Sequence, residues 1–128
     1  MKETLRQRIG VDVGRRISAE EAIEWADQNE VYYFDIQTDI APNALESFDD
    51  SRCSKIREGC EQHGLHLGLH TLSGVNIAEI SPHLREAADA YLRNYIDLSV
   101  KLGAEWIVVH GGYHFTGCQK IRKQASID

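Results

Sequence analysis

The chain has 128 residues and a mass of 14.5 kDa, with 42% hydrophobic residues and a formal net charge of −6 from 14 basic and 20 acidic side chains. This composition is typical of one globular domain, residues 1–128, and excludes disordered, collagen-like and low-complexity chains. The excess of acidic over basic side chains argues against a nucleic acid partner, because it repels the phosphate backbone. No apolar run approaches the roughly 20 residues that cross a bilayer, and no secretory signal opens the sequence. We therefore expect no membrane partner and a cytoplasmic location.

The pattern of hydrophobic residues predicts four short strands that alternate with three helices. In chain order, the expected elements are a strand at 8–13, a helix at about 19–29, a strand at 31–38, a helix at about 50–63, a strand at 65–70, a helix at about 82–102 and a strand at 104–110. Residues from about 117 to 128 are expected to begin a fourth helix. Repeated strand–helix–strand units are right-handed and give a parallel sheet, so the sequence predicts an α/β fold.

Capping residues mark the ends of these helices. Ser18 and Glu21 have the spacing of a capping box before the first helix. Ser81, which precedes a proline, is the expected N-cap of the third helix. Gly64 and Gly103 are suited to end the second and third helices, because glycine readily adopts the left-handed conformation after a helix.

Two of the helices carry an apolar stripe at helical spacing. In the second helix, Cys53, Ile56 and Cys60 are predicted to be small core residues. With Cys118 the chain has three cysteines and no C-x-x-C pair, so a disulfide framework is not expected. The stripe of the third helix consists of Leu84, Ala88, Tyr91, Tyr95, Leu98 and Leu102.

Side chains of a strand alternate in direction, so each predicted strand has two faces. The apolar face carries Ile9, Val11, Val13, Tyr32, Phe34, Ile36, Leu65, Leu67, Leu69, Ile107 and Val109. The opposite face carries Asp12, Asp35, Gln37, Asp39, His66, Gly68, His70, Trp106, Val108 and His110. Burying so many ionisable groups costs several kcal/mol unless they are paired, hydrated or bound to a metal. We expect this second face to line a barrel interior or a cleft; the alternative is that its groups only hydrogen-bond one another and the loops.

His70 and His110 are the strongest candidates for metal ligands. Each is the last residue of its predicted strand, both have the same parity, and the two strands are consecutive. Neighbouring strands lie about 4.8 Å apart, so two such imidazoles can reach one divalent ion at about 2.1 Å. Two ligands are too few for a tight zinc site, so at least one more is needed. In the loop beyond, His114 is a candidate to touch a substrate.

Three stretches of the chain resemble one protein family. They are residues 67–71 (Leu-Gly-Leu-His-Thr), 84–93 (Leu-Arg-Glu-Ala-Ala-Asp-Ala-Tyr-Leu-Arg) and 102–115 (Leu-Gly-Ala-Glu-Trp-Ile-Val-Val-His-Gly-Gly-Tyr-His-Phe). They are similar to sugar-phosphate isomerases and epimerases, a superfamily of xylose isomerase-like TIM barrels that includes endonuclease IV (AP endonuclease family 2). The resemblance covers roughly residues 8–115.

The resemblance implies a barrel with a divalent metal (zinc, manganese or magnesium) at its C-terminal mouth. His70 and His110 match the positions where endonuclease IV-like members place zinc-binding histidines. In the sugar epimerases the metal is held by residues of strands five to eight, and the matching histidines lie beside the substrate. Asp12, Asp39 and His114 are then expected to contact substrate hydroxyls, and no catalytic residue is assigned.

A complete TIM barrel needs about 250 residues and eight strands. We therefore expect this chain to be the N-terminal (β/α)4 half of a metal-dependent isomerase or epimerase acting on a sugar or sugar phosphate, inactive alone because the carboxylates of the second half are absent. Two alternatives stay open: an endonuclease IV-like zinc phosphodiesterase, and a non-catalytic half-barrel that acts as an assembly or binding module. Unpaired sheet edges invite association, so we expect self-association through the open barrel edges, with C2 pairing the commonest arrangement.

Overall fold

A computed structural model describes residues 5–112, 124 and 127 of the chain. Strands and helices alternate along it, as predicted. The elements are β1 (Gly10–Gly14), α1 (Ala19–Gln28), β2 (Tyr33–Ile36), α2 (Asp50–His63), β3 (His66–His70), α3 (Pro82–Leu102) and β4 (Trp106–Val108), with 3-10 turns at Leu5–Arg8 and Leu45–Ser47. Cys118, His114 and nearly all of the expected fourth helix lie outside the described residues. Within that described part, no helix combines the length and apolar character needed to span a bilayer.

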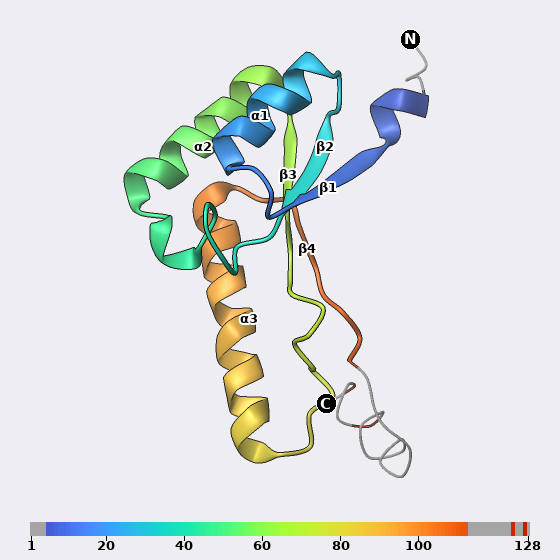
Figure 1. The fold of residues 1–128 in the computed structure, drawn as a ribbon, viewed down its shortest axis with the longest axis vertical. Helices are drawn as coiled ribbons and strands as arrows, with labels where there is room; N and C mark the ends of the chain where they lie inside the picture. Colours follow the sequence, from blue (N-terminus) through green and yellow to red (C-terminus); the bar gives the residue numbers. More distant parts are fainter. Residues whose placement is uncertain (1–4, 113–123, 125–126, 128) are drawn as a thin grey trace.

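The four strands form one parallel sheet in the order β1-β2-β3-β4. Its register aligns Asp12 with Asp35, Asp35 with Gly68, and Gly68 with Trp106. These four residues therefore form one row across the sheet. The three helices lie on one side of this sheet (Figure 1). This arrangement is a half TIM barrel, as the sequence predicted, because each βαβ unit returns its strand parallel to the last one.

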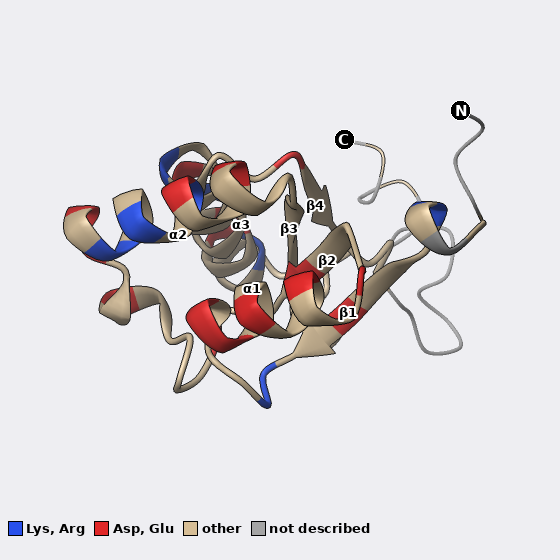
Figure 2. Cartoon of the chain, turned by 90° about the horizontal axis from the view of Figure 1, so that it is seen from above, with Lys and Arg blue, Asp and Glu red and all other residues tan. Residues whose placement is uncertain are grey.

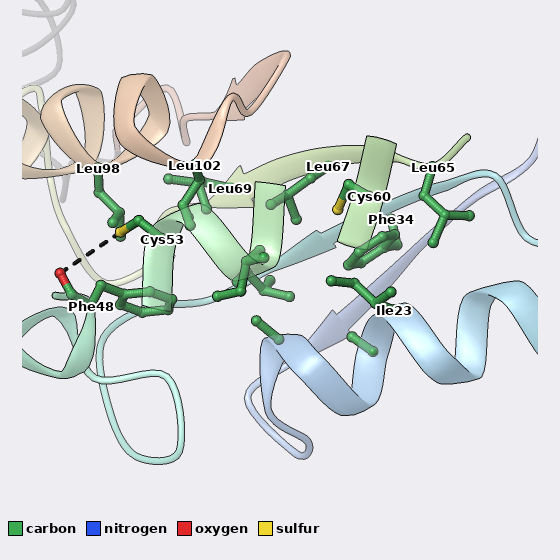
Figure 3. Close-up of a cluster of buried hydrophobic side chains, with 14 of the residues drawn as sticks. Ile23, Phe34, Phe48, Cys53, Cys60, Leu65, Leu67, Leu69, Leu98 and Leu102 are labelled. Carbon is green, nitrogen blue, oxygen red and sulfur yellow. Dashed lines mark hydrogen bonds between the residues drawn. The ribbon is translucent and has the colours of Figure 1, made fainter. Parts of the chain in front are cut away.

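Residues of β2 and β3 supply the centre of the hydrophobic core. Phe34, Leu67 and Leu69 are at most 3% exposed, and they pack with helix residues such as Ile23 and Leu98 (Figure 3). The apolar face predicted for these two strands is thus confirmed. Each such side chain contributes about 1.5–3 kcal/mol when it is fully buried.

The two cysteines of α2 belong to this core, as predicted. Cys53 and Cys60 are buried free thiols, and burial raises the pKa of Cys60 to about 11. The thiol of Cys53 donates to the carbonyl oxygen of Phe48 at 3.8 Å (Figure 3). A thiol with a raised pKa is a weak nucleophile, so Cys60 is a packing residue.

Three residues expected on buried faces are exposed instead. Ile9 and Val109 are 52% and 45% exposed because they lie just outside β1 and β4, the two edge strands. Leu84 is 58% exposed in the first turn of α3. For Ile9 and Val109, the alternation that assigned them to the core continues in the sequence beyond the ends of the strands.

Strands β2 and β4 are shorter than the predicted ranges 31–38 and 104–110. The N–H group of Thr38 donates to the hydroxyl of Tyr95 at 3.2 Å and not to a neighbouring strand, so β2 has already ended there. Val108 pairs with His70, the last residue of β3, and β4 ends with that pair. His110 consequently follows the strand and does not end it.

The caps at the start of α1 and at the ends of α2 and α3 are confirmed. The Ser18 hydroxyl accepts from the Glu21 N–H group at 3.1 Å, and the Ser18 N–H group donates to the Glu21 carboxylate at 2.8 Å. Gly64 and Gly103 adopt left-handed conformations with φ of 64° and 68°. Ser81 precedes α3 as expected, but its side chain makes no capping hydrogen bond.

The two serines at helix starts provide a matched test of capping. We expect Ser18→Ala to lower the free energy of unfolding by about 1 kcal/mol, because the substitution removes a capping hydrogen bond. Ser81→Ala, the same change at a serine without that bond, should have a much smaller effect. Urea denaturation followed by circular dichroism measures both values. Equal losses in the two variants would contradict the assignment.

Candidate functional site

Three ionisable side chains from consecutive strands meet on the side of the sheet opposite the helices. Nδ1 of His70 lies 3.3 Å from Oδ1 of Asp35 and 3.5 Å from Oδ2 of Asp12. One ligand atom from each of the three residues lies within 4.8 Å of the other two. Two carboxylates and an imidazole in this arrangement form a candidate cation site. We call these three residues the Asp12–Asp35–His70 cluster.

The sheet register explains how the cluster forms. Asp12 and Asp35 are direct partners on β1 and β2, so their carboxylates meet on the same face. The partner of Asp35 on β3 is Gly68, and His70 follows two residues later with the same orientation. Because Gly68 has no side chain, the indole of Trp106 occupies the space above it. Trp106 Nε1 lies 3.5 Å from Oδ2 of Asp35, to which it donates.

The two carboxylates of the cluster differ in their surroundings. The Asp35 side chain is 13% exposed and that of Asp12 is 42% exposed. Oδ1 of Asp12 accepts from the N–H group of Gly14 at 2.6 Å. Burial raises the pKa of Asp35, and the negative charge of Asp12 raises it further, against the opposing effects of His70 and Trp106. Ionised Asp35 is thus an unfavourable charge that a bound cation would stabilise.

His110 lies next to the cluster, beside His70. Its ring centroid is 5.3 Å from that of His70, and the two rings are tilted by 38°. The two histidines predicted to pair are therefore neighbours in space. His110 is partly buried in the segment that follows β4. The closer partners of His70 are nevertheless Asp12 and Asp35, and Asp35 had no assigned role in the sequence analysis.

Asp39 lies apart from the cluster. Its two carboxylate oxygens accept from the hydroxyls of Tyr91 and Tyr95 at 2.8 and 2.9 Å. The sequence placed Asp39 on the same face as Asp35 by alternation, but β2 ends at Ile36 and the alternation ends with it. His114, the third residue expected to contact substrate, lies outside the described residues.

Aromatic side chains line the same face toward the N-terminal ends of the strands. His66 stacks on Tyr33 with a centroid distance of 4.5 Å, and its Nδ1 atom lies 2.5 Å from a carboxylate oxygen of Glu105. Tyr33 and Trp106, together with Arg8 and Gly10, line a hollow of about 410 Å³. His66 is thus engaged away from the cluster. The hollow extends from Gly10 and Tyr33, in the row of His66, to Trp106, in the row of Asp12 and Asp35.

Residues 21–128 match the family described as the xylose isomerase-like TIM barrel. The chain belongs to this family. The family predicted from the residues around His70 and His110 is therefore confirmed. The sequence matches no curated protein at a significant level.

Solved structures with the same fold include proteins of different activities. D-psicose 3-epimerase from Clostridium cellulolyticum has a TM-score of 0.72 at 13% identity, over 92% of this chain and 44% of that chain. Endonuclease IV from Thermus thermophilus has a TM-score of 0.72 at 21% identity, over the same shares. A xylose isomerase domain protein from Planctomyces limnophilus has a TM-score of 0.63 at 13% identity, over 91% and 45%. The chain thus spans less than half the length of these neighbours, and the likeness establishes the fold.

The raised pKa of Asp35 gives a prediction for stability without metal. Below the ordinary carboxyl pKa, Asp35 is protonated in both the folded and unfolded states and its burial has no electrostatic cost. As the pH rises, the unfolded state releases its proton more readily, so the folded wild type loses stability. In EDTA, Asp35→Asn should therefore raise the Tm by roughly a few degrees at pH 7.5 and by less at pH 3.5.

Thermal denaturation of both proteins at the two pH values measures this effect. Asp89→Asn, the same substitution at an exposed position of α3, is the matched control and should leave the Tm nearly unchanged. A Tm difference between the wild type and Asp35→Asn that is the same at both pH values would contradict the prediction.

Proposed function

We propose that this chain is the cation- and substrate-binding half of an isomerase- or epimerase-like barrel that acts on a sugar or sugar phosphate. The Asp12–Asp35–His70 cluster carries the proposal, because three ligand atoms from three strands lie within 4.8 Å of one another. The cluster occurs in a chain of the xylose isomerase-like family. His70 is the last residue of β3, and such a fold binds ligands at the C-terminal ends of its strands.

The donor set fits a divalent cation. Carboxylate oxygens and imidazole nitrogens are ligands of Mg²⁺, Mn²⁺ and Zn²⁺. A cation would also offset the burial of the Asp35 carboxylate and the repulsion from Asp12, which together raise the pKa of Asp35. Asp12, Asp35 and His70 would hold the ion, and His110 is close enough to His70 to add a ligand or to bind a substrate oxygen beside it.

A divalent cation bound at this site would polarise a substrate carbonyl. The residues of this chain would orient the sugar: His110 offers a ring nitrogen, and the indole of Trp106, which donates to Asp35, offers an aromatic surface beside the site. Proton transfer at the adjacent carbon needs a carboxylate that is placed over the substrate. We assign that carboxylate to the other half of the barrel, so the isolated half should have little turnover.

An endonuclease IV-like phosphodiesterase is the second candidate. The adjacency of His70 and His110 supports it, because the resemblance implies zinc-binding histidines at these positions. The charge of the chain argues against it, because acidic side chains outnumber basic ones by 20 to 14, and several acidic positions lie on α1 (Figure 2). Such a surface repels a phosphate backbone. Binding of a DNA duplex with an abasic site at low salt, in the presence of zinc, would favour this candidate over the first.

Cation binding by the whole chain tests the proposed site. We expect isothermal titration with Mn²⁺ to give one site, and His70→Ala or Asp35→Asn to weaken binding at least about tenfold, because each removes a ligand. His63→Ala removes an exposed histidine of α2 that pairs with Asp27, and is the matched control. Equal affinities in the wild type, His70→Ala and Asp35→Asn would exclude the site.

We further propose that a second copy of this chain covers the interior face. Strands β1 and β4 each have one neighbour in the described sheet, and exposed Ile9 and Val109 lie at these edges. The hollow beside Tyr33 and Trp106 offers room for opposing side chains. Pairing would remove two open strand edges, which otherwise invite aggregation. A two-fold arrangement would bring together two copies of the same surface.

Light scattering after size exclusion measures this association. We expect a mass of twice 14.5 kDa in the presence of Mn²⁺. Ile9→Lys and Val109→Lys place a charge at the sheet edges and should shift the protein toward the monomer. Val100→Lys makes the same kind of change at an exposed position of α3 and should leave the mass unchanged. A monomeric wild type would refute the pairing.

A further inference from the structure

Asp39 is held on both sides by two tyrosines of one helix. Tyr91 and Tyr95 are four residues apart on α3, so their side chains lie on the same face of the helix, with ring centroids 4.9 Å apart. Their hydroxyls lie 2.8 and 2.9 Å from the two oxygens of the Asp39 carboxylate. Hydrogen bonds to a carboxylate are stronger than those between neutral groups. We call Asp39, Tyr91 and Tyr95 the tyrosine clamp.

The same two hydroxyls also contact the backbone where β2 and β3 end. The hydroxyl of Tyr91 accepts from the N–H group of Leu72 at 2.8 Å. The hydroxyl of Tyr95 accepts from the N–H group of Thr38 at 3.2 Å and lies 3.3 Å from the carbonyl oxygen of His70. The clamp therefore supplies hydroxyl acceptors to the N–H groups of Thr38 and Leu72, which lie just beyond the ends of β2 and β3.

The network is largely buried. Tyr95 is 2% exposed and Thr38 is 1% exposed. Burial raises the pKa of both Tyr91 and Tyr95, so both phenols stay protonated and can donate to Asp39. Thr71, the residue after His70, is also 2% exposed, and its hydroxyl donates to the carbonyl oxygen of Val108 at 2.9 Å. The backbone around His70 is thus fixed from α3 on one side and from β4 on the other.

This geometry points to a role for Asp39 that differs from the expected contact with substrate. We propose that the tyrosine clamp positions His70: Tyr95 fixes the backbone of His70, Tyr91 fixes that of Leu72, and Asp39 aligns the two phenols. The three residues are positioning residues that act on the cluster through the strand ends. The proposal rests on the proposed function insofar as His70 is taken as a cation ligand.

Removal of one hydroxyl tests the clamp. Tyr95→Phe keeps the ring and its packing but removes the contacts to Asp39, Thr38 and His70. We expect it to weaken Mn²⁺ binding about tenfold at a temperature where the variant is fully folded, as is typical when a group that orients a ligand is lost. Tyr32→Phe makes the same change at a partly buried tyrosine that packs against the core, and should bind Mn²⁺ within about twofold of the wild type.

A second readout separates the clamp from the cation site. The ¹⁵N resonances of the His70 ring, recorded without metal, should shift in Tyr95→Phe and not in Tyr32→Phe. If the wild type binds no Mn²⁺ but these resonances shift, the proposed function fails and the clamp stands. If the wild type binds Mn²⁺ and Tyr95→Phe has the same affinity and the same His70 resonances, the clamp is refuted.

Loss of a buried hydroxyl can also unfold the protein, so a milder variant is needed. Tyr91→Phe removes the contacts to Asp39 and Leu72 and leaves those of Tyr95 to the backbone. It should weaken Mn²⁺ binding less than Tyr95→Phe does, because its backbone contact lies two residues beyond His70. If Tyr95→Phe does not fold, unchanged Mn²⁺ affinity and unchanged His70 resonances in Tyr91→Phe refute the clamp.

Discussion

Burial of one face of a parallel sheet under three helices is the constraint on which the rest of the structure depends. Phe34 and Ile36 of β2, with Leu67 and Leu69 of β3, are fully buried or nearly so. Since strand side chains alternate, this burial directs the residues between them, such as Asp35, to the opposite face. A slip of one residue would exchange the two faces, so the core also fixes which groups reach the site.

The sequence was sufficient to predict the elements, the parallel order and most caps, because these depend on local patterns. It also assigned Asp12, Asp35 and His70 to one face. It could not show that these three side chains meet, because which side chains are opposite one another depends on the strand register, and the register is set by contacts between residues far apart in the chain. Asp39 illustrates the limit: alternation holds only while a residue belongs to a strand, and β2 ends three residues earlier, at Ile36.

The site contains two kinds of ligand that suit different cations. Its adjacent imidazoles, His70 and His110, are suited to zinc, whereas the carboxylates of Asp12 and Asp35 are suited to harder cations. An epimerase and an endonuclease align with the chain at the same TM-score of 0.72. The fold thus leaves the reaction open, and the side chains on the interior face decide it.

One feature of that face links its packing to sequence variation among relatives. The indole of Trp106 on β4 occupies the space where Gly68 on β3 has no side chain. One aromatic ring therefore covers the interior face of both strands at this row. Any larger residue at position 68 would collide with this ring, and a smaller residue at position 106 would leave a void. Positions 68 and 106 should therefore covary among relatives, as a small residue with a large one. Because Trp106 also donates to Asp35, such an exchange would alter the electrostatics of the site together with its packing.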